Sequence, residues 1–421
     1  MGQTIAEKII ARAAGVEAVR PGEYVTVSPD YTVIQELYFV RNLKTMARLG
    51  IDRLAHPDKV VAVVDHTSQA AVGSGYQELH TYARQFAERT GFKNFFGPGS
   101  GLRHLVMVEK GFARPGTLIF SDEGNIASIG AVNALNIPIS WEVLVTMIGD
   151  ENWVRVPASV RIEVLGDRLP PGVWVRDLVQ AINRDFGTGD DLVQKCVEFT
   201  GPGLAALSLD SRQGLLAGMY HAGADTAIME ADELALSYVA ERAAGRPYQP
   251  VAADPDATYD LHVSYDLTTL TPFVTAPPTH DNVVPVAEVA GTRVDQATIG
   301  SCASNRFDDL QAAAEVLRGR QVSPHVTMYI SPGSAEVYAR AAREGLLEIF
   351  AEAGAAVQSP GCNTCWGYLG QLTDGQTSIS THQEHYPGRN GSRQAQIYLA
   401  NPYVVAASAV TGKITDPREL W

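Results

Sequence analysis

Short runs of hydrophobic residues alternate with helical hydrophobic patterns along nearly the whole chain. Residues 60–66 (VVAVVDH) form an almost continuous apolar run, and residues 76–91 after them have the mixed apolar and polar pattern of a helix. Continuous apolar runs predict strands buried on both faces, and strands that alternate with helices predict a parallel sheet. By the same criteria we expect strands at 117–122, 326–332 and 355–360, and a helix at 334–354. The chain is therefore predicted to have an α/β fold.

Local signals predict where several elements begin and end. The first ten residues, MGQTIAEKII, predict an amphipathic helix. Asp30 and Ser334 are expected to cap the N-termini of helices, and Gly354 is expected to end the helix before it. Cys196 lies in LVQKCVEFTG, which we interpret as a helix with the cysteine on its apolar face, packed in the core.

Length and composition set the size and class of the protein. A chain of 421 residues suits two or three domains. Residues 249–285 are rich in Pro, Asp and Thr and predict a linker between domains. The composition, 45% hydrophobic and 19% charged, is that of a globular protein. The longest apolar run, near Val61–Val64, is far too short to span a bilayer.

Charge and cysteine content narrow the partners and the compartment. The formal charge is −14 and no extended basic cluster occurs, which argues against nucleic acid and anionic membranes as partners. The N-terminus lacks the basic-then-apolar pattern of a signal peptide. Four cysteines in a chain of this size argue against a disulfide framework and favour a reducing cytoplasm.

The chemically reactive residues follow the predicted strands. His66, Asp122, the pair Ser301–Cys302 and the segment Pro360–Cys362 each come just after a strand candidate. Ligands of α/β proteins bind at the carboxyl ends of the strands. These positions are therefore the first candidates for a functional site.

Cys362 and Cys365 form a Cys-x-x-Cys pair inside a glycine-bracketed loop. A redox pair would open a helix directly after a strand in a small domain. A structural zinc site needs four ligands in two close pairs, and the sequence has no second pair. A third interpretation joins Cys302 to the pair, since three thiolates can hold three irons of a [4Fe–4S] cluster and leave the fourth iron open. Buried structural cysteines remain an alternative.

Several motifs together carry a family resemblance. They are GSC-x5-DDL at Cys302, GC-x-x-C-x-G at Cys362, PGRNGS, NPYVVAASAVTGKITDP, VEKGFARPG and DNVVPVAEVAG. With the N-terminal MGQTIAEKIIARAAG, they resemble the large subunit of isopropylmalate dehydratase and homoaconitase, in the aconitase superfamily. The resemblance covers essentially the whole chain.

The resemblance implies an architecture, a cofactor and a partner. Such large subunits have three α/β domains around a central cleft, which we place at 1–157, 158–273 and 274–421. The third domain carries the cysteines Cys302, Cys362 and Cys365, which are expected to hold a [4Fe–4S] cluster. The swivelling fourth domain of the superfamily is a separate small subunit and is absent from this chain. A small-subunit partner is therefore expected.

The resemblance also implies a reaction. A small hydroxy-acid binds the open iron through its hydroxyl and a carboxylate, a base removes a proton from the neighbouring carbon, and water leaves or returns. Asp65, His66, His104 and Asp122 match family residues that act on the leaving hydroxyl or water. The family's base is a serine of the small domain.

The departures from the family concern the pocket. Where the family has Asp-Ser-His-Thr, this chain has Asp122-Glu123-Gly124-Asn125. The family's Asn and Glu in the middle domain align with Ala217 and His221. Its Ser-Asn-Arg-Asn-Phe becomes residues 382–386, HQEHY, which places Glu384 where the first substrate-binding arginine stands. The second arginine survives as Arg389.

These departures assign further candidate residues. Glu123, His221 and Glu384 are candidate bases. The candidate substrate-binding residues are Arg389, Arg306, Ser304, His382 and His385. A glutamate in place of an arginine repels a second carboxylate, by about 4 kcal/mol at 4 Å and an effective dielectric of about 20. The substrate then has one carboxylate fewer or carries a cationic group, or else the new histidines and glutamates bind a metal.

The sequence therefore predicts a cytoplasmic iron–sulfur hydro-lyase that acts on a small hydroxy-acid other than isopropylmalate. Two alternatives stay open. One is an aconitase-fold enzyme whose rebuilt pocket catalyses another lyase reaction, such as decarboxylation or C–S or C–N cleavage, or a metal-dependent reaction. The other is a non-catalytic iron-sensing module.

Overall fold

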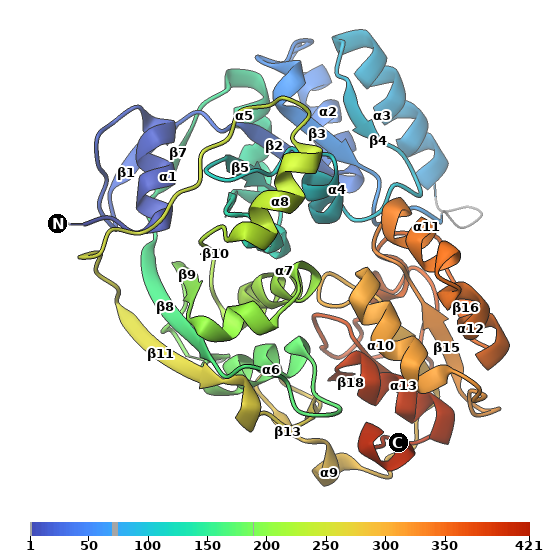
Figure 1. The fold of residues 1–421 in the computed structure, drawn as a ribbon. Coiled ribbons are helices and arrows are strands. Elements are labelled where there is room, and N and C mark those ends of the chain that lie inside the picture. The colour runs from blue at the N-terminus through green and yellow to red at the C-terminus, as the bar shows by residue number, and fades with distance from the viewer. Residues whose placement is uncertain (1, 70–74, 188) are drawn as a thin grey trace. The chain divides into compact units, whose positions relative to one another are not determined.

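The computed structural model describes residues 2–69, 75–187 and 189–421, which fold into helices and parallel sheets (Figure 1). The chain groups into two compact units. Unit 1 comprises the described residues of Met1–Glu163, Leu192–Thr200 and Ala224–Val263, and unit 2 those of Val164–Asp191, Gly201–Gly223 and Ser264–Trp421. The predicted α/β fold class is confirmed. The finer division into three domains stays a prediction.

Unit 1 contains a five-stranded sheet whose described neighbours are all parallel, in the order β4-β3-β2-β5-β6. Its strands are β2 (Tyr31–Gln35), β3 (Val60–Val63), β4 (Asn94–Phe96), β5 (Leu118–Ser121) and β6 (Leu135–Pro138). The helices of this region are α2 (Glu36–Arg48), α3 (Tyr76–Thr90), α4 (Arg103–Glu109) and α5 (Val143–Gly149). The strands predicted at 60–66 and 117–122 and the helix predicted at 76–91 are confirmed.

Helices α2 and α3 lie side by side and share one hydrophobic core with the sheet (Figure 1). Phe39 of α2 meets Phe86 of α3 edge to face, with ring centroids 6.0 Å apart. Ile34 of β2 and Ala62 of β3 belong to the same buried cluster. Burial of these apolar faces explains why the continuous apolar run of β3 is a strand covered by helices.

A second sheet has the order β10-β9-β8-β11. Its strands are β8 (Ala158–Leu165), β9 (Lys195–Thr200), β10 (Thr226–Met229) and β11 (Leu261–Asp266). Helix α1 (Ile5–Ala14) is the predicted N-terminal amphipathic helix, and Thr4 and Glu7 cap it reciprocally. Strands β1 (Tyr24–Val27) and β7 (Asn152–Arg155) form an antiparallel pair, and α8 (Glu233–Arg242) follows β10.

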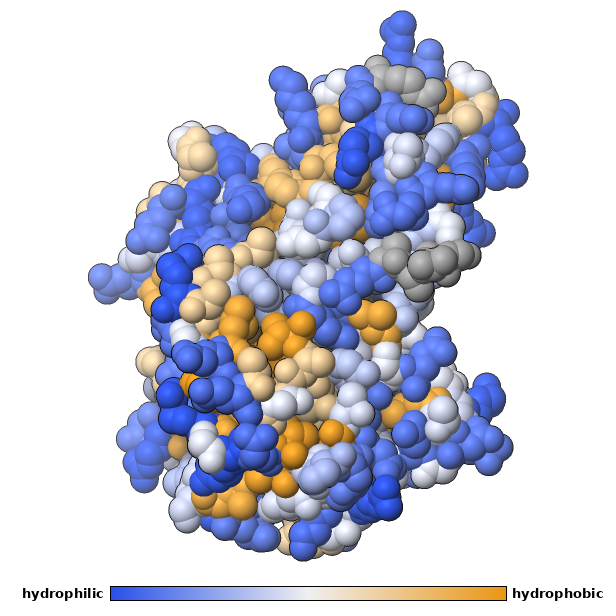
Figure 2. Space-filling model, turned by 90° about the vertical axis from the view of Figure 1, so that its right-hand side faces the viewer, coloured by the Kyte–Doolittle hydropathy of each residue, from blue (hydrophilic) through white to orange (hydrophobic). Residues whose placement is uncertain are grey.

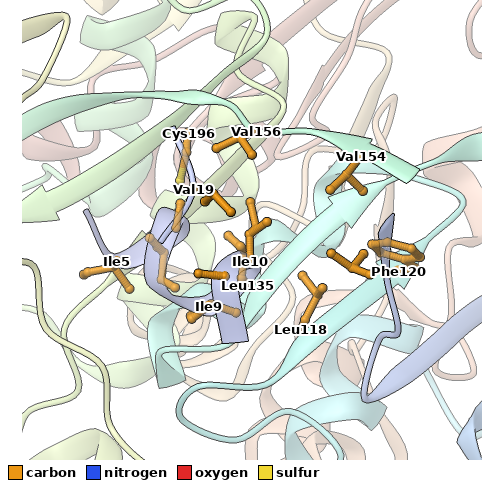
Figure 3. Packing of buried hydrophobic residues seen from close by; sticks show 14 residues of the cluster. Ile5, Ile9, Ile10, Val19, Leu118, Phe120, Leu135, Val154, Val156 and Cys196 are labelled. Atoms are coloured by element: carbon orange, nitrogen blue, oxygen red, sulfur yellow. The ribbon is translucent and has the colours of Figure 1, made fainter. Parts of the chain in front are cut away.

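Cys196 packs in the core, as predicted, but on a strand rather than a helix. It lies in β9 between parallel β8 and β10, is fully buried, and joins a cluster that includes Ile9 and Ile10 of α1 (Figure 3). The helix prediction was wrong because a short apolar segment suits either element, and here pairing on both sides decides.

Unit 2 is built on a seven-stranded sheet in the order β13-β12-β18-β17-β14-β15-β16. Five strands of this sheet are parallel to one another: β14 (Gln296–Ile299), β15 (Thr327–Ile330), β16 (Ala356–Val357), β17 (Thr377–Ser380) and β18 (Gln396–Ala400). Strands β12 (Phe273–Thr275) and β13 (Val283–Pro285) extend it antiparallel. The helices are α6 (Val175–Phe186), α7 (Leu209–Gly218), α9 (Val286–Val289), α10 (Phe307–Leu317), α11 (Ala335–Arg343), α12 (Leu346–Ala353) and α13 (Pro402–Thr411).

Three predictions of local structure need correction. Asp30 does not cap a helix: it precedes β2, where its carboxylate accepts the N–H of Leu118 at 2.7 Å. The single helix predicted at 334–354 is divided into α11 and α12, because Gly345 has a φ of 78° that an α-helix cannot continue through. The segment 249–285, predicted as a linker, contains β11, β12 and β13. Ser334 and Gly354 cap helices as predicted.

On the face shown in Figure 2, hydrophobic residues gather in patches that hydrophilic residues surround. Among residues 2–69, 75–187 and 189–421, no helix is both long enough and apolar enough to cross a membrane.

Candidate active site

In unit 1, the loop after β3 is held by the first residue of α2. The carboxylate of Glu36 accepts the backbone N–H groups of Asp65 at 3.2 Å, His66 at 3.0 Å and Thr67 at 2.6 Å. Glu36 is buried, and burial together with the nearby Asp65 carboxylate raises its pKa, although its hydrogen bonds oppose the shift. The loop that presents Asp65 and His66 therefore has a fixed backbone.

Asp65 and His66, predicted as a functional pair, are in direct contact. The Nδ1 of His66 lies 2.7 Å from the Oδ1 of Asp65. Burial disfavours the charged imidazole, but the adjacent Asp65 carboxylate outweighs burial and raises the pKa of His66 to about 9. Burial also disfavours the charged Asp65, and here Arg103 and His66 outweigh it, so the pKa of Asp65 is lowered. The pair is charged at neutral pH.

Arg103 connects the candidate carboxylates of unit 1. Its guanidinium pairs with Asp65 at 2.9 Å, with Asp122 at 3.2 Å and with Glu123, and it is 2% exposed. Burial raises the pKa of Asp122 to about 6, although Arg103 opposes the shift. His104, the next residue of α4, is also buried. One buried cation thus holds three predicted site residues together.

Neither Arg103 nor Glu36 was predicted as a site residue from the sequence. Arg103 could have been found, because a charged residue directly before His104, at the start of a short apolar helix, suggests a buried functional group. Glu36 begins α2 directly after strand β2, which was not predicted either.

Glu36, Asp65 and His66 place ligand-type atoms within 4.8 Å of one another, close enough for one metal ion to reach all three. Their oxygens already accept N–H groups of the loop and of Arg103. Hydrogen bonds within the protein therefore account for the closeness of these three side chains without a metal ion.

In unit 2, the cysteine loops follow strands of one parallel sheet. Cys302 lies after β14, and Cys362 and Cys365 lie after β16, in and beside the 3-10 turn η7 (Asn363–Trp366). Strand β15 separates β14 from β16, and the three are parallel. Their carboxyl ends therefore lie at the same edge of the sheet.

Close contacts between neighbouring loops fix this edge. The N–H of Gly333 donates to the carbonyl of Asn305 at 2.8 Å, and Ser331 donates to Gln358. Gly300, before Cys302, has a φ of 138°, and a Cβ there would lie 2.6 Å from Ser331. Only glycine fits this position without displacing the backbone.

The cysteines and their surroundings suit an iron–sulfur cluster. Cys362 and Cys365 are buried, and the pKa of Cys365 is lowered, chiefly by a hydrogen bond with Cys362, despite its burial. Thiolates are the ligands of such clusters. Ser304 Oγ, Thr364 Oγ1 and the amide of Asn305 are buried polar atoms without a hydrogen-bond partner among the described residues. Unsatisfied buried polar atoms at one sheet edge are expected where a ligand belongs.

Glu384, one of the candidate bases, connects two other predicted residues. Its Oε1 lies 3.4 Å from the Nδ1 of His221 and its Oε2 lies 3.2 Å from the Nη1 of Arg389. Arg389 also donates from Nε to the carbonyl of Cys365 at 3.1 Å, and its guanidinium lies over the ring of Trp366 at 4.5 Å. The structure thus brings His221, Glu384 and Arg389 together beside the cysteine loop.

His280 joins this group, although the sequence analysis did not select it. Its ring centroid lies 5.5 Å from that of His221 and 5.7 Å from that of His385. His385 and His382 are both buried, and their ring nitrogens lie near polar groups of the described residues without forming hydrogen bonds of good geometry. No short-range sequence signal marks His280, because it lies far from the other histidines in the chain.

The remaining predicted residues lie in the same unit. Arg306 caps α10 and donates from Nη1 to the carbonyl of Cys302 at 3.0 Å. Ser304 is buried within that loop. Arg176 of α6, which the sequence analysis missed, donates to the side-chain oxygen of Gln383 at 2.5 Å and to the carbonyl of His382 at 2.7 Å. Arg176 therefore fixes the backbone of the segment that contains Glu384.

The predicted site residues thus form two sets. Unit 1 holds Asp65, His66, His104, Asp122 and Glu123. Unit 2 holds Cys302, Cys362, Cys365, His221, Glu384, Arg389, Arg306, Ser304, His382 and His385.

Comparisons with known proteins agree on one family. Residues 7–412 match the model of the aconitase family (aconitate hydratase). The large subunit 1 of 3-isopropylmalate dehydratase from Methanopyrus kandleri is 36% identical over 420 residues, which cover 99% of each chain. The corresponding large subunit 1 from Pyrococcus furiosus is 37% identical over 425 residues, which cover 100% of this chain and 99% of that one.

The fold also resembles a solved structure. The holo-form of aconitase X from Thermococcus kodakaraensis has a TM-score of 0.51 against this chain, with 90% of this chain and 88% of that chain covered. The identity is 11%, so the likeness concerns the fold alone.

Proposed function

Because this chain belongs to the aconitase family, we propose that it is the large subunit of an iron–sulfur hydro-lyase whose substrate is a small hydroxy-acid other than isopropylmalate. Its relatives are dehydratases, and the enzyme class follows from them. The restriction on the substrate is carried by one observation. It is the ion pair between Glu384, which the family resemblance places where a substrate-binding arginine stands, and Arg389, at 3.2 Å.

Cys302, Cys362 and Cys365 are the residues that would hold the cluster. When bound, a [4Fe–4S] cluster with an open iron supplies a Lewis acid for the hydroxyl and carboxylate of a hydroxy-acid. Among the protein groups, Arg389 fixes the cysteine loop through the carbonyl of Cys365. Arg306 does the same for the loop of Cys302.

The residues of unit 1 suit proton transfer to a leaving hydroxyl or water. His66 carries a proton at neutral pH, and Asp65 orients its ring through Nδ1. Asp122 has a pKa of about 6, so it exchanges a proton near neutral pH. A general acid is most effective when its pKa lies near the working pH. His66 and Asp122 are therefore the proposed acids of the dehydration.

We assign the proton-abstracting base to the partner subunit. The relatives are described as large subunits, which implies a small subunit, and the small subunit is the proposed source of the base. Within this chain, Glu123 is paired with Arg103, and Glu384 with Arg389. Ion pairing weakens both carboxylates as bases, and burial lowers the pKa of His221, the third candidate, so the small subunit is the preferred source of the base.

The test is solvent exchange by the reconstituted enzyme. The full chain is loaded anaerobically with iron and sulfide, combined with co-expressed candidate small subunits, and incubated in D₂O with a panel of hydroxy-acids. We expect deuterium at the carbon next to the hydroxyl-bearing carbon of one acid and not of isopropylmalate. Exchange into isopropylmalate as the preferred substrate would refute the substrate restriction. A cluster-loaded complex that exchanges none of the acids would refute the hydro-lyase.

A further inference from the structure

Two of the three nitrogens of the Arg389 guanidinium, Nε and Nη1, already face acceptors within the protein. A guanidinium has five N–H groups, and a carboxylate is bound in a fork by two that lie parallel on one edge. Nε of Arg389 donates to Cys365, and Nη1 faces both Glu384 at 3.2 Å and the hydroxyl of Tyr386 at 3.4 Å. Each edge of the guanidinium contains either Nε or Nη1. Neither edge therefore offers two uncommitted parallel donors to a substrate carboxylate.

Glu384 is committed in the same way. One carboxylate oxygen faces Arg389 and the other faces His221. A cationic substrate group would have to compete with a guanidinium that is 8% exposed and stacked on Trp366. The pair is thus closed to a second anion by its negative partner and to a cation by its positive one.

The imidazoles beside the pair add polarity without charge. Burial lowers the pKa of His221, and it lowers the pKa of His280 to about 3. Burial also lowers the pKa of His385 to about 4, although the nearby carbonyls of Ala276 and Thr279 oppose this shift. Neutral imidazole offers one donor and one acceptor. This side of the site therefore offers hydrogen bonds rather than ionic contacts.

We propose that the substrate carries a single carboxylate, and that the Glu384–Arg389 pair faces a neutral hydrogen-bonding group of that substrate instead of a second carboxylate. This inference rests on the proposed function, which supplies the hydroxy-acid substrate, and it adds the number of carboxylates that this substrate carries. Its physical basis is that a second carboxylate near Glu384 meets a like charge, while the cation that would compensate it is already paired.

A metal bound by the histidines is a weaker explanation of the same residues. Among the described parts of the chain, the sole set of three ligand-type side chains whose atoms lie within 4.8 Å of one another is Glu36, Asp65 and His66 in unit 1. His221, His280 and His385 do not form such a set, so an ion would require these rings to move.

The experiment compares two ligands that differ only in charge. Malate and its 4-carboxamide have nearly the same shape, but the first has two carboxylates and the second has one. Dissociation constants are measured by calorimetry on the full chain with its cluster reconstituted anaerobically. We expect the amide to bind the wild-type protein at least 10-fold more tightly than malate. In Glu384→Gln, we expect the ratio to shift at least 10-fold toward malate, because Arg389 loses its carboxylate partner.

Two further variants control the result. Glu344→Gln removes a carboxylate that pairs with Arg340 at 2.8 Å on the surface of the same unit, and it should leave the ratio unchanged. Glu384→Ala should shift the ratio in the same direction as Glu384→Gln, which guards against poor folding of one variant.

Three outcomes would overturn the inference. They are equal or tighter binding of malate by the wild-type protein, an unchanged ratio in both Glu384 variants, and no malate binding by either variant. Deuterium exchange in the same samples reports on the hydro-lyase separately. A correct preference without exchange would reject the proposed function and leave the charge class standing.

Discussion

Replacing Arg103 by methionine should destabilise unit 1 more than any surface substitution. Methionine keeps most of the aliphatic length of arginine but removes its charge. The side chains of Asp65 and Asp122 are 1% and 0% exposed, so neither carboxylate gains water when the guanidinium is lost. Glu123 is 25% exposed and can turn toward solvent.

The magnitude follows from the uncompensated charges. Removing one partner of a buried ion pair costs about 3–5 kcal/mol. Asp122, whose pKa of about 6 is already raised by burial, would take up a proton at neutral pH once Arg103 is gone. This neutralisation relieves part of the repulsion. We therefore expect a loss of ~3 kcal/mol at pH 7.5 and a smaller loss at pH 5.

Native-state hydrogen exchange measures the effect locally. Peptides that cover β2, β3 and β5 report the opening free energy of the sheet that carries this network. Arg53→Met is the matched control, because Arg53 is 92% exposed and lies 3.9 Å from Asp52 at the surface of the same unit. Adding Asp122→Asn to Arg103→Met should restore part of the loss, because the Asp122 side chain is 0% exposed. If Arg103→Met changed the opening free energy no more than Arg53→Met, the account of Arg103 as the central cation would be wrong.

Three further predictions concern the cluster, the pH dependence and a loop glycine. Cys302→Ser should lower the iron content of the anaerobically reconstituted chain, while Cys196→Ala should keep it; equal iron in both would contradict the ligand assignment. Burial raises the pKa of Asp122 from its ordinary value of 3.8 to about 6, so between these values the folded state binds more protons than the unfolded state. Stability therefore falls as pH rises through this range. Asp122→Asn should remove about 1–3 kcal/mol of this pH dependence in denaturant titrations, and an unchanged slope would argue against the raised pKa. Gly300→Ala should lower the melting temperature and the iron content together, because its Cβ would lie 2.6 Å from Ser331; a melting temperature equal to that of the wild type would show that the loop can adjust.

Much of the fold was accessible from local pattern. The continuous apolar run of β3 and the amphipathic pattern of α3 identified both elements, because hydrophobic periodicity belongs to a short segment. The same criterion failed at Cys196, where a short apolar segment suits a helix or a strand. It also failed at 249–285, whose turn-forming composition concealed short strands that pair with distant partners.

The candidate site was accessible only in part. The position of His66, Asp122 and the cysteines after strands followed from sequence, because the carboxyl ends of parallel strands are where loops converge. Their partners did not follow. Arg103 is 38 residues from Asp65, and Arg176 is 207 residues from Gln383. Contacts at such separations are set by the register of packed elements, which no local pattern records.

The sequence by itself determined which segments form helices and which form strands in most cases, because this depends on short-range order. It also identified the three candidate cluster cysteines and the two glutamates that depart from the family pattern, because these depend on residue identity alone. Tertiary structure decided what the glutamates do: Glu123 meets Arg103 and Glu384 meets Arg389. The reason is that the effect of a charge depends on the distance to its counter-charge and on the water excluded around both. Folding sets both quantities.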